Sequence, residues 1–295
     1  RFTVDTLAAL RRRDFLFGSS LLLASPLLAR AARAAPPRII SLDYGLAQTL
    51  IEFGTPPVGL IDTQGWYDWV MEPPLPPGIA NVGSNYEINM EMLQLLQPDL
   101  IISTPYLEWI RPQLETIAPV KSFPIHALGS SPYPHIVAAT LELGQIVGQP
   151  QQAQALIDRT ERDLLAAKAA TRRLAEQKLA IMTFLDARNI RVYGPGGIFQ
   201  DVIDRLDLHN AWTRRTNEWG FSDAGLADLI AIGDSRIFYM DPVPPDVLAG
   251  LAGSPLWQAM PFVQRGHAER MASVLMFGAL PSVSRFARLL AEVKV

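Results

Sequence analysis

The chain has 295 residues, of which 49% are hydrophobic and 19% charged, a composition typical of globular proteins rather than of disordered or membrane-embedded ones. The formal net charge of -3 argues against nucleic acid as a partner, because phosphate binding needs clustered lysine and arginine. The chain has no cysteine, which excludes disulfides, thiolate nucleophiles, iron–sulfur clusters and a lipid anchor on cysteine.

The first residues have the pattern of an export signal. The run Arg11-Arg12-Arg13 is followed by an apolar stretch from Leu21 to Leu28 and by a small-residue tract containing Ala32-Arg33-Ala34. A charged start, a short apolar region and an A-x-A site describe a cleaved signal peptide, here over residues 1–34, and the paired arginines favour the twin-arginine type. A basic amphipathic N-terminus is the alternative. We expect a soluble, unanchored, acidic protein in the periplasm.

Short apolar strands alternate with helical segments between residues 35 and 149. Asn89 is a predicted helix N-cap, and Gly54, Gly148 and Pro150 mark helix ends. Such alternation indicates a parallel sheet. The predicted strands are residues 38–42, 58–61 and 100–102, and the predicted helices are residues 46–53, 90–96 and 133–147.

An uninterrupted helical segment follows. Residues 151–177 contain no glycine or proline and are rich in good helix formers, which predicts one long helix. We therefore predict an α/β protein of two lobes with mainly parallel sheets, joined by one long rigid α-helix. Such a connection would allow only small interlobe movement. A single larger domain is the alternative. The predicted N-terminal lobe is residues 35–149, the spine helix residues 150–178 and the C-terminal lobe residues 179–295.

The second lobe repeats the alternation of the first. Its predicted elements are strands at residues 179–184 and 237–240 and helices at residues 198–206 and 282–293. The run Gly194-Pro195-Gly196-Gly197 precedes one of these helices, but its proline spoils a dinucleotide fingerprint, and a tight turn explains it better.

Catalytic motifs are missing from the sequence. It has no G-x-S-x-G elbow, Walker loop or H-E-x-x-H motif, so we predict that the protein is not an enzyme and has no cofactor or metal site of its own. The histidines have no i, i+4 pair and are predicted to be surface or core-edge residues, although three ligands drawn from both lobes would still suit a zinc or manganese binder. They are His126, His135, His209 and His267.

Aromatic residues gather in predicted loops beyond strand ends. Ligands bind beyond the carboxyl ends of parallel strands, and Trp and Tyr offer flat apolar faces with one hydrogen-bonding atom each. The sequence therefore predicts a cleft lined with aromatic rings. Its candidates are Trp66, Tyr67, Trp69, Tyr86, Tyr106, Trp109, Trp212 and Trp219.

Several segments, in the same order along nearly the whole mature chain, resemble a known family. They are Glu72-Pro73-Pro74-Leu75-Pro76, Tyr193-Gly194-Pro195, Asn210-Ala211-Trp212, Trp219-Gly220 and the stretch SPLWQAMPFV at residues 254–263. The chain resembles the periplasmic hydroxamate-siderophore (ferrichrome-type) binding proteins of enteric bacteria. The resemblance implies a class III periplasmic binding protein fold. It also implies a monomer that delivers a ferric siderophore to an ABC permease and its ATPase in the inner membrane.

The resemblance also implies a ligand site. Trp69, Tyr106 and Trp219 would contact the ligand, with the Tyr106 hydroxyl bonded to a hydroxamate oxygen. The siderophore already encloses the iron, so the protein needs no metal ligands. The full set of ligand-binding candidates is Trp69, Asn85, Tyr106, Tyr193, Trp219, Leu275 and Phe277.

Three of these positions depart from the family pattern. Asn85 stands in place of an arginine that faces the hydroxamate oxygens, and an amide makes a weaker contact than a charged group. Leu275 and Phe277 stand in place of Trp and Tyr, so the walls stay apolar and lose polar groups. A related hydroxamate or mixed-type siderophore is therefore as compatible as ferrichrome. Arg188 or Arg191 would be a replacement charge, although solvated arginines explain them as well.

Docking to the permease in this superfamily uses one carboxylate from each lobe. Glu91 matches the N-terminal position. The matching position in the C-terminal lobe is Ala227, so the neighbouring Asp228 is the candidate there. An ordinary surface acid is the alternative for both. Other cargo on the same scaffold, namely cobalamin, haem or a zinc or manganese ion, stays open. A siderophore-modifying hydrolase is a further alternative.

Overall fold

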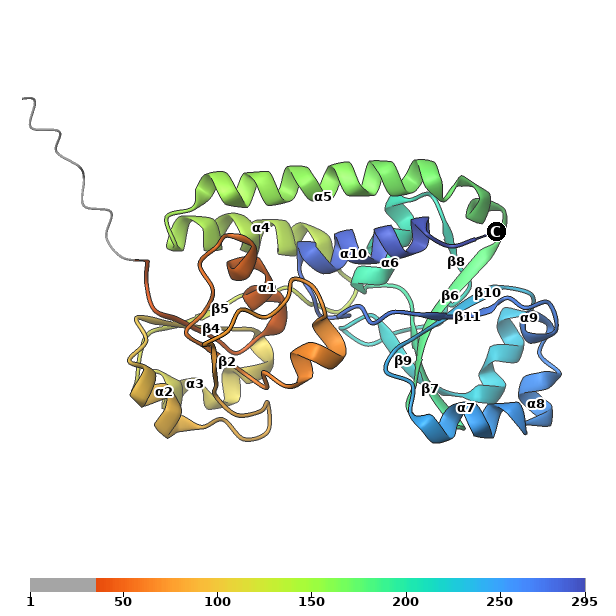
Figure 1. The fold of residues 1–295 in the computed structure, drawn as a ribbon, viewed down its shortest axis with the longest axis horizontal. Helices are drawn as coiled ribbons and strands as arrows, with labels where there is room; N and C mark the ends of the chain where they lie inside the picture. Colours follow the sequence, from red (N-terminus) through yellow and green to blue (C-terminus); the bar gives the residue numbers. More distant parts are fainter. Residues whose placement is uncertain (1–35, 295) are drawn as a thin grey trace, which may run out of the picture. The chain divides into compact units, whose positions relative to one another are not determined.

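The computed structural model describes residues 36–294, so the predicted leader over residues 1–34 and its cleavage site lie outside the described residues. Two β-sheets organise this part of the chain (Figure 1). We call the elements from β1 to α4 the N-terminal lobe and those from β6 to β11 the C-terminal lobe. Helix α5 lies between them in the sequence, and α10 follows the second lobe.

The first sheet has five strands in the order β3-β2-β1-β4-β5, and every neighbouring pair is parallel. Ile40 and Ile101 in its middle strands have no exposed surface, as expected for a parallel sheet covered on both faces. Parallel pairing brings the carboxyl ends of the strands to one edge. The strands are β1 (Ile39–Ser41), β2 (Gly59–Leu60), β3 (Ala80–Asn81), β4 (Leu100–Ser103) and β5 (Val120–Ser122).

Helices and helical turns connect these strands. The predicted cap at Asn89 is confirmed, since its Oδ1 accepts the Met92 N–H at 2.9 Å. Asp43 caps the first helix in the same way through Leu46 N–H at 2.8 Å. The connecting elements are α1 (Tyr44–Glu52), the π-helical turn η1 (Trp66–Val70), α2 (Met90–Leu96), the 3-10 turn η2 (Pro105–Ile110), α3 (Arg111–Leu114) and α4 (Pro132–Ile146).

The segment predicted as one long helix contains two consecutive elements. They are α5 (Pro150–Ala170) and the 3-10 turn η3 (Arg172–Glu176). The α-helix ends at Thr171, where the backbone leaves the α-helical region with φ −90° and ψ 5°, and the chain continues as a 3-10 turn. Helix α5 packs against α4 and α10 (Figure 1).

The second sheet is mixed. Its strand order is β11-β10-β6-β7-β9, with β8 paired to β6, and only β7 runs antiparallel to its neighbours. The strands are β6 (Lys178–Phe184), β7 (Asn189–Tyr193), β8 (His209–Asn210), β9 (Phe221–Gly225), β10 (Arg236–Met240) and β11 (Ala268–Met271). The helical elements are α6 (Ile198–Arg205), the 3-10 turn η4 (Leu226–Ile232), α7 (Pro245–Ala252), α8 (Pro255–Gln258), α9 (Pro261–Gln264) and α10 (Leu280–Ala291).

One buried apolar cluster joins the two lobes. It includes Leu50 of α1, Leu143 of α4, Leu164 of α5, Phe199 of α6 and Phe286 of α10. Protein interiors are close-packed, so side chains shared in this way hold the surrounding elements in one arrangement. The boundaries between the lobes and the spine helix, at residues 149 and 179, stay a prediction.

Candidate ligand-binding cleft

The carboxyl ends of the parallel strands place four loops along one edge of the first sheet. The loop after β2 carries Trp69, the loop after β3 Asn85, the loop after β4 Tyr106 and the loop after β5 His126. Large apolar rings are normally buried, yet five in these loops are at least 44% exposed. They are Tyr67, Trp69, Tyr86, Tyr106 and Trp109. Exposed aromatic surface of this kind makes this edge of the sheet the candidate binding face.

The start of helical turn η2 explains why Tyr106 is exposed. Thr104 is extended, and Pro105 occupies the first position of η2, where its fixed φ favours a helical turn. Leu107 and Ile110 are buried beneath the turn. Tyr106 therefore lies just beyond the end of β4 with its ring half exposed.

Helical turn η1 separates two tryptophans. Trp66 has no exposed surface, and its Nε1 donates to the Pro73 carbonyl at 3.0 Å. Trp69, three residues later in the same turn, is 44% exposed. The sequence predicts that Trp66 and Trp212 line the cleft, and this prediction is wrong. Trp212 is only 2% exposed, and the two rings pack in the cores of the N-terminal and C-terminal lobes, respectively.

Four rings meet between the lobes, and we call Tyr106, Trp219, Phe221 and Phe277 the interlobe aromatic cluster. The Tyr106 and Trp219 ring centroids are 6.1 Å apart at 71°. Trp219 stacks on Phe221 at 6.1 Å and 14°, and meets the Phe277 ring edge-on at 6.3 Å. Tyr106 comes from the N-terminal lobe and Trp219 from the C-terminal lobe, so aromatic residues far apart in the sequence share one site.

A tight turn before β9 fixes two members of the cluster. The Asn217 Oδ1 atom accepts the N–H groups of Trp219 at 3.1 Å and Phe221 at 3.2 Å. Gly220 has φ +77°, and a Cβ atom there would lie 2.1 Å from the nitrogen of Gly197. Only glycine fits this position, since any side chain would be strained by the backbone conformation and would collide.

The segment between β11 and α10 brings Leu275 and Phe277 to the first lobe. Leu275 is 6% exposed and belongs to the apolar cluster of the N-terminal lobe. Helix α1 approaches so closely that a Cβ at Gly45 would lie 2.8 Å from the Phe277 carbonyl oxygen. The Ser273 hydroxyl donates to the Trp69 carbonyl at 3.1 Å. Trp69 and Phe277 are therefore carried by two segments that contact each other.

Tyr193 lies behind the cluster. Its ring is 5% exposed and meets Phe221 edge-on at 6.5 Å, and its hydroxyl is 3.2 Å from that of Thr183. Burial raises the pKa of this hydroxyl to about 12. In this position Tyr193 supports Phe221. Arg191, considered as a replacement charge, lies 3.9 Å from the centre of the Phe221 ring and pairs with Asp223 at 2.9 Å.

The polar candidates are on the surface. Asn85 is exposed in the turn between Ser84 and Glu87. Glu91 is exposed in the first turn of α2. Asp228 accepts hydrogen bonds from Arg214 at 2.7 Å and from the Gly225 N–H at 2.9 Å, and the Arg214 bond is the main reason its pKa is lowered. The Asp228 carboxylate thus already has partners within the chain.

His126 is a neighbour of the cluster that the sequence did not single out. Its ring meets Phe277 edge-on at 5.9 Å, and both ring nitrogens are buried without a hydrogen-bond partner. Burial, with a smaller contribution from His135, lowers the His126 pKa to about 4. The ring is therefore neutral at neutral pH. The order of strands in the sheet, with β5 next to β4, places the His126 loop beside that of Tyr106.

Other features of the described residues bear on alternative cargo. Among residues 36–294, no group of three His, Asp or Glu side chains is arranged to hold a metal ion. A hollow of about 770 Å³ is lined by Leu128 and Ser131 of the N-terminal lobe and by Gln200, Asn210 and Trp212 of the C-terminal lobe. None of the seven predicted ligand-binding residues lines it. In the same part of the chain, every helix is too short or too polar to cross a membrane.

The sequence of the chain is similar to those of known binding proteins. A family described as periplasmic binding protein matches residues 39–273. The iron(3+)-hydroxamate-binding protein FhuD of Escherichia coli (strain K12) is 30% identical over 289 residues, covering 96% of each chain. The achromobactin-binding periplasmic protein of Dickeya dadantii (strain 3937) is 26% identical over 280 residues, covering 85% of this chain and 84% of that protein.

Structure comparison agrees with the predicted fold. The crystal structure of the siderophore-binding protein FhuD from Vibrio cholerae bound to Fe³⁺–Desferal superposes with a TM-score of 0.82 at 23% sequence identity. The match covers 88% of this chain and 97% of that chain. The predicted α/β architecture of two mainly parallel sheets in a class III arrangement is thereby confirmed.

Proposed function

The chain belongs to the periplasmic binding protein family, and we propose that this protein captures a ferric siderophore of the hydroxamate type between its lobes and delivers it to the permease of an ABC importer. The similarity to a hydroxamate-binding relative along nearly the whole chain supports this ligand class. The observation that carries the proposal is the interlobe aromatic cluster, in which Tyr106 of one lobe meets Trp219 of the other at 6.1 Å.

The chemistry of the cluster suits such a ligand. A ferric hydroxamate presents apolar chain surface and electron-rich oxygens around an iron that the siderophore already coordinates. Trp219 and Phe277 offer apolar faces, and the Tyr106 hydroxyl donates a hydrogen bond to a hydroxamate oxygen. The Asn85 amide supplies a second, uncharged donor. The protein then needs no resident metal and no cofactor.

The remaining candidates act as walls and supports. Trp69 offers an exposed ring on the N-terminal lobe, Leu275 anchors the segment that carries Phe277 in the apolar cluster of that lobe, and Tyr193 holds Phe221 in place. We propose that Tyr193 contributes through this packing, because its hydroxyl already contacts Thr183.

We propose capture without chemical conversion. The lack of a nucleophile–base motif in the sequence and the membership in a family of binding proteins support this. A ferric hydroxamate recovered by mass spectrometry after long incubation should have an unchanged mass. Recovery of a cleaved ligand would instead indicate a siderophore-modifying hydrolase.

Delivery requires a contact with the permease and its ATPase in the inner membrane. We propose that Glu91 provides the carboxylate of the N-terminal lobe, and that Asp228 exchanges Arg214 for a permease arginine. Glu91→Gln should keep ligand affinity unchanged and lower ligand-stimulated ATP hydrolysis by the importer. An unchanged ATPase rate would remove Glu91 from the docking surface.

We propose that the working protein is a monomer in the periplasm. It would be exported by a twin-arginine signal over residues 1–34 and would consist of the lobes at residues 35–149 and 179–295 with the spine at residues 150–178. The intact mass of protein secreted into the periplasm, measured without denaturation, tests both the cleavage after Ala34 and the oligomeric state.

A ligand panel tests the proposed function. Titration of the mature protein with the ferric Desferal complex or with ferrichrome should quench tryptophan fluorescence saturably and raise Tm. Iron-free Desferal and a ferric catecholate are the controls and should bind more weakly. If no ferric siderophore in the panel gives quenching or a Tm shift, the proposal fails. Binding of haem, cobalamin, zinc or manganese instead would indicate other cargo on the same scaffold.

A further inference from the structure

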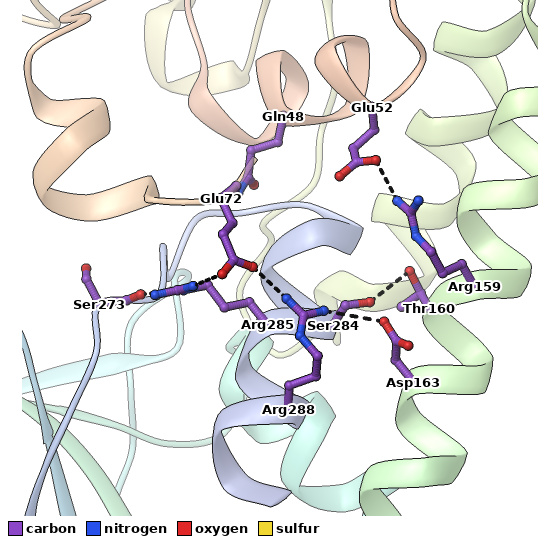
Figure 2. A network of polar contacts seen from close by, with 10 residues as sticks. All are labelled: Gln48, Glu52, Glu72, Arg159, Thr160, Asp163, Ser273, Ser284, Arg285 and Arg288. Atoms are coloured by element: carbon purple, nitrogen blue, oxygen red, sulfur yellow. Dashed lines mark hydrogen bonds and ion pairs between the residues drawn. The ribbon is translucent and has the colours of Figure 1, made fainter. Parts of the chain in front are cut away.

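A polar network joins the N-terminal lobe to the last helix of the chain (Figure 2). At its centre is Arg285 of α10, which is only 8% exposed. Its Nε donates to the Ser273 carbonyl at 2.8 Å, and its Nη1 donates to the carboxylate of Glu72. Arg288 donates to the same carboxylate at 2.6 Å. Glu72 therefore receives two guanidinium groups from α10.

Gln48 of α1 makes a second connection to the same segments. It has no exposed surface, and its Nε2 donates to the Glu72 carbonyl at 2.7 Å. Its Oε1 accepts the Ala279 N–H at 3.2 Å and the Ser282 hydroxyl at 3.0 Å. The Glu72 carbonyl is thus linked through Gln48 to Ala279 and Ser282. Its carboxylate is linked through Arg285 to the Ser273 carbonyl (Figure 2).

The two segments that meet here carry candidate ligand residues. Glu72 lies three residues after Trp69, and the Trp69 carbonyl itself accepts the Ser273 hydroxyl at 3.1 Å. Ser273 and Ala279 flank the segment that contains Phe277. The network therefore sets where the Trp69 segment lies relative to the Phe277 segment.

We propose that Glu72 is a positioning residue for ligand binding, which, through Arg285 and Gln48, holds Trp69 and Phe277 in the arrangement that receives the siderophore. The affinity argument rests on the proposed function, whereas the connection between the segments does not. A buried guanidinium that loses its carboxylate is strongly unfavourable, and a fully satisfied buried polar network favours one arrangement.

The chain provides a matched control. Glu52 of α1 pairs with Arg159 of α5 at 2.6 Å, so it is also a glutamate that joins two elements through an arginine (Figure 2). This pair contacts neither the Trp69 segment nor the Phe277 segment. Its loss removes a partly exposed ion pair, which contributes little to stability.

The test compares Glu72→Gln with Glu52→Gln. Because coupling through such contacts changes binding by roughly 2- to 30-fold, we expect E72Q to weaken binding of the ferric Desferal complex about tenfold. E52Q should stay within about twofold of the wild-type protein. Equal affinities of E72Q and wild type, or equal losses in both variants, would overturn the proposal.

Hydrogen exchange in the ligand-free proteins gives an independent measurement. The amides of residues 66–79 and 272–279 should exchange faster in E72Q than in the wild-type protein, and at the wild-type rate in E52Q. A wild-type exchange rate in E72Q would contradict the proposal. Should wild-type protein fail to bind ferric Desferal, the proposed function fails and this exchange comparison still decides the positioning role. If E72Q does not fold, Ser273→Ala takes its place, because it removes only the bond to Trp69. S273A must then show both the weaker binding of ferric Desferal and the faster amide exchange.

Discussion

At the scale of single residues, the Tyr106 hydroxyl is the most specific polar contact in the proposed site. Tyr106→Phe keeps the ring that faces Trp219 and removes only the hydroxyl. A hydrogen bond contributes about 0.5–1.5 kcal/mol net, so this variant should bind a ferric hydroxamate roughly 2- to 10-fold more weakly. Tyr106→Ala, which also removes the ring, should bind more weakly still.

Isothermal titration with the ferric Desferal complex measures this difference. Tyr239→Phe is the control, because Tyr239 lies on β10, packs against Phe184 and is not among the proposed ligand contacts. If Y106F and Y106A both bind the complex as tightly as the wild-type protein does, Tyr106 is not part of the site.

His126 determines a pH dependence of stability. Its pKa is about 4 in the folded protein against an ordinary value of 6.5, so the folded state binds fewer protons than the unfolded chain between these pH values. The stabilising contribution of the neutral ring is therefore complete above pH 6.5 and is lost as the pH falls toward 4. The total is at most about 3 kcal/mol, from 1.36 kcal/mol per pKa unit.

The variant His126→Leu isolates this contribution. Burial raises the pKa of Asp43 to about 6, so its contribution to stability falls as the pH rises from 3.8 to 6, opposite to that of His126. Asp43 is present in both proteins, so its contribution cancels in the comparison. Urea unfolding at a series of pH values should show wild type losing stability relative to H126L as the pH drops below 6.5. A constant difference across this range would show that His126 does not titrate in this way.

At the scale of elements, the turn before β9 decides whether two rings of the interlobe aromatic cluster are in place. Gly220→Ala combines a positive φ with a collision against Gly197, so we expect a loss of about 3 kcal/mol or more and weak ligand binding. Gly54→Ala is the control, since Gly54 also has positive φ but has nothing within 4 Å of its Cβ position.

Thermal unfolding of the two variants separates these costs. G54A should lose about 1 kcal/mol from the backbone conformation alone and keep wild-type ligand affinity. If G220A were no less stable than G54A, the close approach of Gly220 to Gly197 would have no energetic importance, and the turn would not fix Trp219.

The elements were more predictable than the site. The helix ends before Gly54 and Gly148 and the cap at Asn89 follow from local backbone chemistry, which short sequence windows record. Pro150, predicted to close the same helix as Gly148, is instead the first residue of α5. The segment 150–178 was predicted as one helix because a composition rich in helix formers does not record the change from α-helix to 3-10 turn after Ala170.

The site depends on contacts between distant segments. Trp66 and Trp69 have the same local context in the sequence, and only tertiary packing buries one and exposes the other. The Glu72–Arg285 pair joins residues 213 positions apart, and no periodicity indicates it. His126 looked like one of four scattered histidines until the sheet order placed its loop beside the cluster.

At the scale of the whole molecule, binding and delivery depend on different surfaces. The interlobe aromatic cluster would receive the ligand, the Glu72 network would set the relative position of two ligand-bearing segments, and Glu91 would face the permease. One apolar cluster shared by α1, α4, α5, α6 and α10 holds these parts together. We therefore expect ligand binding and permease docking to be separable by mutation.

Locating the iron tests the central claim most directly. In a crystal of the mature protein with the ferric Desferal complex, the anomalous signal of iron should appear beside the contacting Tyr106 and Trp219 rings, with a hydroxamate oxygen at hydrogen-bonding distance from the Tyr106 hydroxyl. An iron peak in the hollow lined by Gln200 and Asn210 would contradict the account. So would an iron peak coordinated directly by protein side chains.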